Sequence, residues 1–448
     1  KYSRKTEPFL PNAYVIATSS LLHKGNINKA AELAQEVFKI APALPDVNYV
    51  NAFCNYKLKN YTVALEFCNK ALDKDRKTTS LVTDSGTAGW KTHHLMGEIY
   101  FNMEKWADAL NFYLKTFEYN KKELPLIVNI ARCYEYLNIP DKAMEYYQKS
   151  VSMGSGAYPF FIEYMADFIE HIQGSRESLK LLEQYLTIYP DHHHINLRKA
   201  ELLRRKEEYS EAIRLYTMVI NHLNERTKPY EGLIYLNRGI CYYYSGDKHM
   251  AEEDFIKSID IEPGDINPYI NLAYIYIDTG RPQKAIEYLI KAEHRDDLTI
   301  ILVLSEAYIC ADRTQEAFEL LNKIPSDAKD EFIKAVFMKS DYYMSVNELQ
   351  KAYDAVMDLM SVYPSELEIY RYLIRILIAR ENFTTALSMY DCLLQINPND
   401  VSVLFQKGKL CAFLRNYKEA KIIYSRALKI DPENREIKKA LSSISHLM

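Results

Sequence analysis

Small residues recur through this chain at a nearly constant spacing, and that spacing limits the fold more than any other feature. They form one column of twelve positions: Ala30, Ala64, Ala109, Ala143, Ser178, Ala212, Ala251, Ala285, Ala317, Ala352, Ala386 and Ala420. Six of the eleven steps between neighbours are 34 residues long, and three more are 32 or 35. A repeat of this length predicts a stack of similar helical units rather than a single globular core.

Larger residues follow this column at fixed distances. Bulky or apolar residues stand four positions later, at Tyr113, Tyr147, Leu182, Tyr216, Phe255, Leu289, Leu321, Val356, Tyr390 and Tyr424. Prolines often stand twelve positions later, at Pro42, Pro190, Pro263, Pro364, Pro398 and Pro432. The unit at residues 401–434 shows the whole pattern, with two short helices joined by a tight turn at Arg415-Asn416. Because such a pair cannot bury its apolar face alone, we expect it to stack on its neighbours.

The pattern resembles the tetratricopeptide repeat, a 34-residue unit of two helices. The resemblance covers about residues 11–434. The family's first-helix tryptophan is missing, and its glycine appears plainly only at Gly97, Gly239 and Gly408, with alanine at Ala131, Ala166, Ala200 and Ala273. The resemblance implies an all-α fold: a right-handed α-solenoid superhelix of twelve helix pairs with a C-terminal capping helix, in which the first helices line a concave groove.

Two longer steps, of 45 and 39 residues, interrupt the spacing. The expected organisation is an N-terminal lead (1–10), repeats 1–2 (11–78), a loop insertion (79–89), repeats 3–6 (90–226), repeats 7–12 (227–434) and a capping helix (435–448). The breaks at 79–89 and around 227–229 are hinges or loops on one rim. Loops are favoured, because long surface loops cost little free energy. Ile437, Leu441, Ile444 and Leu447 have the helical spacing of a cap over the last repeat.

Composition narrows the class of protein. A net charge of −4 over 448 residues gives no basic stripe for nucleic acid. No apolar run approaches the roughly 18 residues of a membrane span, and residues 1–10 lack the apolar segment of a signal peptide. Seven cysteines without a C-x-x-C pair, three of them at one place in their repeats (Cys54, Cys133 and Cys241), predict buried free thiols in a reducing compartment. We therefore expect a cytoplasmic protein.

Three asparagines occupy the same groove-facing place in their units: Asn129, Asn237 and Asn271. They resemble part of the asparagine ladder in the repeat arm of O-linked N-acetylglucosamine transferase, which implies a grip on peptide backbone. A carboxamide offers both a donor and an acceptor, so it suits an extended backbone. Asparagine is also common in this chain, so a purely structural role stays open.

Arginines form two further candidate clusters. Arg198 and Arg205 share one helical face, but Glu163, Asp167 and Glu170 of the preceding repeat favour mutual pairing across the repeat boundary. Arg371, Arg375 and Lys409 form a C-terminal patch without such close acidic neighbours, which predicts an acidic partner. Tyr243, Tyr244 and Tyr274 are interpreted either as rings presented to the groove or as core residues.

Several sharper functions are not expected. No three consecutive units carry the Lys, Asn and Arg set with which chaperone co-factors of this family hold a terminal carboxylate. His192-His193-His194 diverge on a helix and lack further ligands, so no metal site is predicted. The sequence shows no phosphate loop and no nucleophile elbow, so we expect neither a cofactor nor catalysis.

The leading hypothesis is therefore a non-catalytic scaffold that binds an extended peptide or partner helix in its groove, as a member of a multiprotein complex. A second hypothesis is an accessory repeat arm of a glycosyltransferase, or of another enzyme, whose catalytic domain is absent from this chain. The segment from Ser80 to Tyr113 resembles, loosely, the repeat tails of some bacterial glycosyltransferases. A third hypothesis is a peptide-sensing regulatory module.

Overall fold

The computed structural model describes residues 10–73, 86–119, 121, 123–153, 160–223, 225, 227–292 and 296–445. These residues form an all-α structure without β-strands, and the chain divides into two compact units, Lys1–Thr227 and Lys228–Met448. The predicted fold class, an all-α solenoid of helix pairs, is confirmed. Residues 79–85 of the predicted loop, most of the N-terminal lead and residues 446–448 lie outside the described residues.

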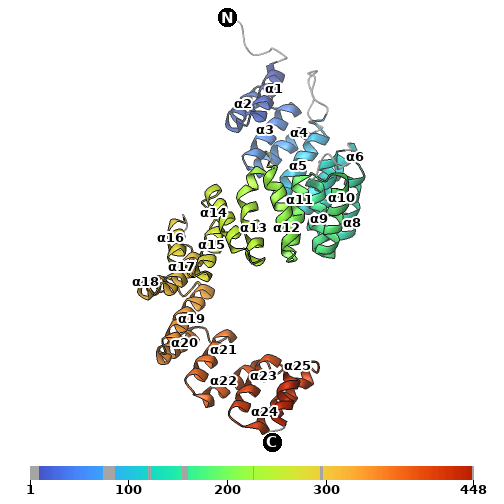
Figure 1. The fold of residues 1–448 in the computed structure, drawn as a ribbon. Helices are drawn as coiled ribbons and strands as arrows, with labels where there is room; N and C mark the ends of the chain where they lie inside the picture. The colour runs from blue at the N-terminus through green and yellow to red at the C-terminus, as the bar shows by residue number, and fades with distance from the viewer. Residues whose placement is uncertain are drawn as a thin grey trace. The chain divides into compact units, whose positions relative to one another are not determined.

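Unit 1 contains six helix pairs, and in each pair the two helices run antiparallel (Figure 1). Their bounds are α1 Leu10–His23, α2 Ile27–Ile40, α3 Pro45–Lys57, α4 Tyr61–Leu72, α5 Trp90–Asn102, α6 Trp106–Tyr119, α7 Leu124–Tyr136, α8 Pro140–Ser152, α9 Phe160–Gln173, α10 Ser175–Ile188, α11 His193–Arg205 and α12 Tyr209–Asn221. Each helix also contacts the next in order, so successive pairs stack side by side.

Unit 2 repeats the same arrangement in six further pairs, preceded by a short 3-10 helix, η2 Lys228–Tyr230. The bounds are α13 Glu231–Tyr244, α14 Lys248–Ile261, α15 Asn267–Asp278, α16 Pro282–Lys291, α17 Leu298–Cys310, α18 Thr314–Leu321, α19 Lys329–Ser345, α20 Leu349–Val362, α21 Leu367–Ala379, α22 Phe383–Ile396, α23 Val401–Phe413 and α24 Tyr417–Ile430. A last helix, α25 Arg435–Ser445, buries Ile437 and Ile444 against the final pair, as a cap would.

The column of small residues is the buried spine of each pair. All twelve members are fully buried, with 0% of their surface exposed. The ten larger residues four positions later are at most 9% exposed, and Tyr113, Tyr147 and Tyr216 are completely buried. Much of the chain's high tyrosine content therefore serves packing, as the sequence predicts for the column.

The glycines of the first helices show why small residues are required. A Cβ placed on Gly97 would lie 2.5 Å from Cδ1 of Tyr113, and one on Gly239 would lie 2.7 Å from Cε1 of Phe255. A Cβ on Gly408 would collide in the same way with the ring of Tyr424. Each second-helix ring therefore lies directly against the backbone of its partner first helix. Leu and Val at this place pair instead with Ala or Ser, as in Ala166 with Leu182.

The turn inside every pair contains a residue in the left-handed region. Four are glycines, namely Gly25, Gly174, Gly246 and Gly280, and eight are not, namely Lys59, Glu104, Asn138, Glu207, Asp312, Asn347, Glu381 and Arg415. A non-glycine residue costs free energy in this conformation, because its Cβ crowds the carbonyl oxygen. The tight stacking of the two helices holds these eight residues in place.

We predict that Gly408→Ala lowers the free energy of unfolding by about 1–3 kcal/mol, because the new methyl group meets the Tyr424 ring. Helix propensity alone predicts an increase in the free energy of unfolding, since alanine favours a helix more than glycine does. In a Tyr424→Leu background the same change should cost far less, because the ring that the methyl group meets is gone. Denaturant unfolding of the four proteins measures the coupling, and additive effects would refute the close packing.

At the turn of the last pair, Arg415 has φ 60°. We predict that Arg415→Gly raises the free energy of unfolding by about 0.5 kcal/mol, whereas Arg415→Val lowers it by about 1–2 kcal/mol. Both changes remove the same charge, so the comparison isolates backbone conformation. Equal unfolding midpoints for the two variants in urea would contradict this account of the turn.

Candidate functional site

The first helices carry a second column of side chains at a fixed place in the repeat. Its members stand eleven residues before the small-residue column and include Glu98, Arg132, Asp167 and Glu201 in unit 1 and Tyr274, Glu306, Asp341, Arg375 and Lys409 in unit 2. All of these side chains are partly or fully exposed. We call this surface the first-helix face. In unit 2 it is hollowed into two pockets.

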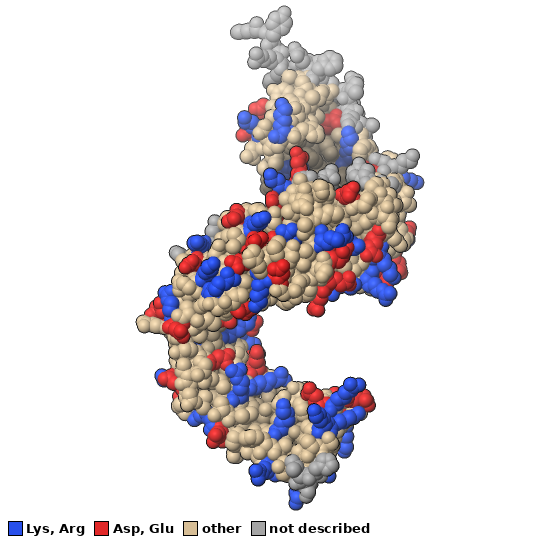
Figure 2. Space-filling model, in the orientation of Figure 1, with Lys and Arg blue, Asp and Glu red and all other residues tan. Residues whose placement is uncertain are grey.

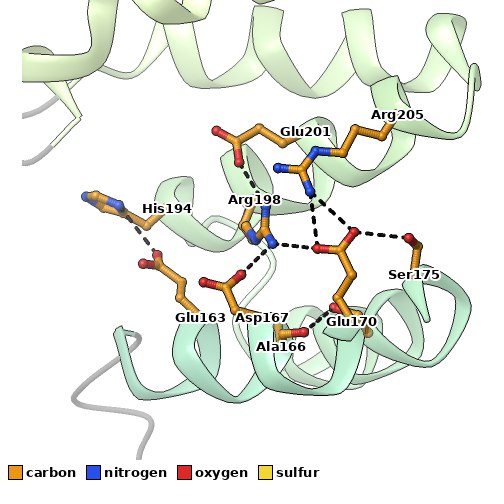
Figure 3. A network of polar contacts seen from close by, with 10 residues as sticks. Glu163, Ala166, Asp167, Glu170, Ser175, His194, Arg198, Glu201 and Arg205 are labelled. Atoms are coloured by element: carbon orange, nitrogen blue, oxygen red, sulfur yellow. Dashed lines mark hydrogen bonds and ion pairs between the residues drawn. The ribbon is translucent and has the colours of Figure 1, made fainter. Parts of the chain in front are cut away.

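In unit 1, Arg198 on α11 lies in a network of carboxylates from α9 and α11 (Figure 3). Its guanidinium forms ion pairs with Asp167, with Glu170 at 2.8 Å and with Glu201 at 3.1 Å. Glu170 also pairs with Arg205 at 3.3 Å and accepts a hydrogen bond from Ser175 at 3.0 Å. The interpretation as mutual pairing across the repeat boundary therefore holds, and Arg198 is engaged within the protein.

The three asparagines have different surroundings. Asn129 donates a 2.9 Å hydrogen bond to Oε1 of Glu98, which also accepts one from the Tyr113 hydroxyl. Asn237 is only 7% exposed. Asn271 donates to the backbone oxygen of Asn267, one helical turn earlier, at 2.9 Å. The environment of the three amides is therefore not repeated from unit to unit.

The tyrosines divide into two kinds. The Tyr243 hydroxyl donates a 2.8 Å hydrogen bond to Asp278, which also pairs with Lys248 at 3.3 Å. This hydrogen bond is the first cause of the raised pKa of Tyr243, followed by burial. Tyr274 is 39% exposed and its pKa is raised by burial and by Glu306. Tyr274 thus offers a ring on the first-helix face, whereas Tyr243 anchors neighbouring repeats.

Arg371 and Arg375 on α21 line a pocket of about 330 Å³. Its floor is apolar, formed by Ile374, Ile378, Tyr390, Leu393 and Val403, and Ser402 and Gln406 complete the lining. Both arginine side chains are more than half exposed. Two guanidiniums above an apolar floor suit a carboxylate next to an apolar side chain. We call this site the α21–α23 pocket. Lys409, exposed on α23, lies with its amine 5.2 Å from the Phe405 ring.

The prediction that this patch lacks close acidic neighbours is wrong. Arg371 pairs with Asp400 at 3.1 Å, and Arg375 pairs with Asp341. Asp400 also caps α23, since its Oδ1 accepts from the backbone N–H of Val403 at 3.0 Å. Ion pairs this exposed contribute roughly 0–1 kcal/mol, so an incoming carboxylate can replace them at low cost.

The pocket occurs where the small–large packing changes. The position that is glycine, alanine or serine in every other first helix of unit 2 is Ile374 in α21. Ile374 faces Tyr390, the large residue of the same pair, and both line the pocket. Two bulky residues cannot interdigitate as Gly408 and Tyr424 do, so Tyr390 is 9% exposed where Tyr424 is 2% exposed.

A second pocket, of about 470 Å³, lies between α17 and α19. Its lining includes Glu306, Ile309, Phe337, Met338, Asp341 and Tyr342. Asp341, which pairs with Arg375 of the first pocket, connects the two sites along the first-helix face. Sequence reasoning missed Glu306 and Asp341, although both stand eleven residues before the small-residue column. That spacing is the signal that identifies them.

Charges of both signs alternate over most of the surface visible in Figure 2, in keeping with the small net charge. Among the described residues no three His, Cys, Asp or Glu side chains are arranged to hold a metal ion. None of the described helices combines the length and apolar character that crossing a bilayer requires. Cys54, Cys133 and Cys241 are buried, and burial raises the pKa of Cys54 and of Cys133 to about 12.

Comparisons with known proteins agree with the architecture. The family model described as "Tetratricopeptide repeat" matches residues 124–153, 233–265, 266–294 and 401–434. The TPR repeat-containing protein MJ1428 of Methanocaldococcus jannaschii is 20% identical over 411 residues, which cover 84% of this chain and 68% of that protein. The human protein O-mannosyl-transferase TMTC3 is 22% identical over 356 residues. This match covers 76% of the present chain but only 35% of the human protein.

Solved structures match this chain at lower sequence identity. Yeast Tom70 aligns over 90% of this chain and 88% of its own, with 16% identity and a TM-score of 0.43. The chain in the APC/C hetero-tetramer Cut9-Hcn1 aligns over 97% of this chain and 90% of its own, with 14% identity and a TM-score of 0.34. The matched repeats, together with one buried small-residue column through twelve helix pairs, make this chain a tetratricopeptide repeat protein.

Proposed function

We propose that this protein is a non-catalytic scaffold that binds an extended segment of a partner protein on the first-helix face of unit 2. The α21–α23 pocket carries the proposal, because it combines exposed guanidiniums with an apolar floor. The favoured partner segment has an acidic residue beside an apolar one. The carboxylate would lie between Arg371 and Arg375, and the apolar side chain would cover Ile374, Leu393 and Val403.

The second pocket, between α17 and α19, extends this surface in one direction. Asp341 and Glu306 give it acidic walls, and Phe337 and Met338 give it apolar ones. The lining also contains Lys334, so two carboxyl groups stand against one amine, and this balance favours an added cation. A segment that continues from the first pocket to the second would therefore carry a basic residue at its far end. Lys409 and Tyr274 lie outside both pocket linings and are proposed as rim contacts.

A specific observation favours a second candidate function. The human relatives TMTC3 and TMTC1, both described as protein O-mannosyl-transferases, match this chain over only 35% and 24% of their length. We propose as the alternative that the repeats form an accessory arm of a longer enzyme. Mass spectrometry of the native protein from its source tests this, because peptides outside the 448 residues would support it and a mature protein of this length would refute it.

For the scaffold, we predict that a double charge reversal, Arg371→Glu with Arg375→Glu, weakens binding of acidic–apolar peptides by at least about tenfold, since two attractions become repulsions. Fluorescence anisotropy with labelled 12-residue peptides measures the affinity, and peptides with lysine in place of the acidic residues test the sign. The matched control is Lys418→Glu with Lys421→Glu, two exposed positions on second helix α24. Equal losses of peptide affinity in both double variants would show that the α21–α23 pocket does not bind the peptide.

A variant that is expected to bind more tightly tests the same pocket. We predict that Asp400→Asn strengthens binding of the acidic peptides about two- to fivefold, because it releases Arg371 from its ion pair. Asparagine still caps α23, so stability should change little. Thermal unfolding checks the stability. Unchanged or weaker binding by a stably folded Asp400→Asn protein would contradict the role of Arg371.

A further inference from the structure

The junction between α9 and α11 in unit 1 contains an acidic group with unusual surroundings. Oε1 of Glu163 on α9 lies 3.5 Å from Nδ1 of His194 on α11, and their side chains are 24% and 11% exposed (Figure 3). Of the side-chain atoms in the described residues, this oxygen is among those buried without a hydrogen-bond partner. The pair therefore has the proximity for a hydrogen bond but lacks an ordinary one, which normally spans about 2.7–3.2 Å.

The charges around Glu163 are predominantly negative. Asp167 lies on its own helix, and Glu201 and the one nearby cation, Arg198, lie on α11. Arg198 is already shared by Asp167, Glu170 and Glu201, and the Arg205 guanidinium contacts Glu170. Four carboxyl groups thus stand against two guanidiniums. An ionised Glu163 adds a charge that the network does not neutralise.

We propose that the α9–α11 junction is a protonation-sensitive contact. One proton held between Glu163 and His194 joins the two helices below neutral pH, and its release to solvent leaves an ionised Glu163 facing Asp167 and Glu201. The proton lies between Oε1 of Glu163 and Nδ1 of His194, and it removes the charge that the network does not neutralise. Release of the proton adds repulsion across a contact between consecutive repeats, so it weakens the stack at this point.

The titration of Glu163 falls in the physiological range. Burial, followed by the charges of Asp167 and Glu201, raises its pKa from an ordinary value of 4.5 to about 7, against the lowering effect of Arg198. Between these two values the folded protein holds more protons than the unfolded chain. The stabilisation is therefore present at acidic pH and is lost as the pH rises toward and through 7.

Intrinsic tryptophan fluorescence reports on unit 1, which contains the α9–α11 junction. The two tryptophans, Trp90 and Trp106, both lie in unit 1, on α5 and α6. Urea unfolding of the full chain, followed by this fluorescence at pH 5.5 and 8.5, gives the unfolding equilibrium constant of unit 1. Other groups contribute their own pH dependence. His193, for example, has a pKa lowered by burial and by His222, so a variant must be compared with the unchanged protein.

The decisive variant is Glu163→Gln, which keeps the shape of the side chain and cannot ionise. Between pH 5.5 and 8.5 the unfolding constant of the unchanged protein should rise about 10- to 30-fold more than that of Glu163→Gln. The control Glu177→Gln alters an exposed carboxyl on α10 that pairs with Lys180, and it should follow the unchanged protein. Parallel pH profiles for Glu163→Gln and the unchanged protein would overturn the proposal, as would an equal effect of the control.

A second measurement keeps the proposal testable if Glu163→Gln folds poorly. Amide hydrogen exchange of the full chain, corrected for intrinsic rates, should show protection of α9 and α11 falling from pH 6 to pH 8 more than that of α3 and α4. Equal changes in the two regions would place the pH dependence elsewhere and refute the proposed contact.

Discussion

The structure depends on one repeated contact: from the pair α5–α6 onward, each second helix buries a large side chain, and in three pairs its ring lies against the backbone of the first helix. Gly97, Gly239 and Gly408 have no room for a Cβ, because the rings of Tyr113, Phe255 and Tyr424 occupy that space. This contact sets the distance between the paired helices. The twelve buried small residues then allow the pairs to stack.

The positions of the candidate functional surfaces follow from this packing. The side chains of the first-helix face are partly or fully exposed, and they carry charge or an aromatic ring. In unit 1 two of these side chains, Asp167 and Glu201, belong to the ion-pair network around Arg198. In unit 2 Arg375, together with Arg371, borders an open pocket. The pocket lies where Ile374 replaces the usual small residue. A local exception to the packing rule thus accompanies the proposed binding site.

The sequence predicts the helix pairs well, because their spacing is imposed by packing that must be repeated in every unit. It also predicts the pairing of Arg198 with acidic residues of the preceding repeat, since charge and position suffice for that inference. It does not predict that Asn237 is buried, that Asn129 donates to Glu98, or that Asp341 and Asp400 pair with Arg375 and Arg371. These contacts join residues about 30 positions apart, and they depend on rotamers and inter-repeat distances that a spacing pattern does not contain.

Amide hydrogen exchange along the full chain tests the central claim most directly. If one continuous small–large contact holds each pair, the backbone amides of the column, such as Ala420, whose N–H donates to Asn416 at 3.0 Å, should exchange as slowly as any in their own unit. The account predicts such protection at every column position of both units. A column residue that exchanges as rapidly as the turns beside it would show a pair that is not held by this contact, and would contradict the account.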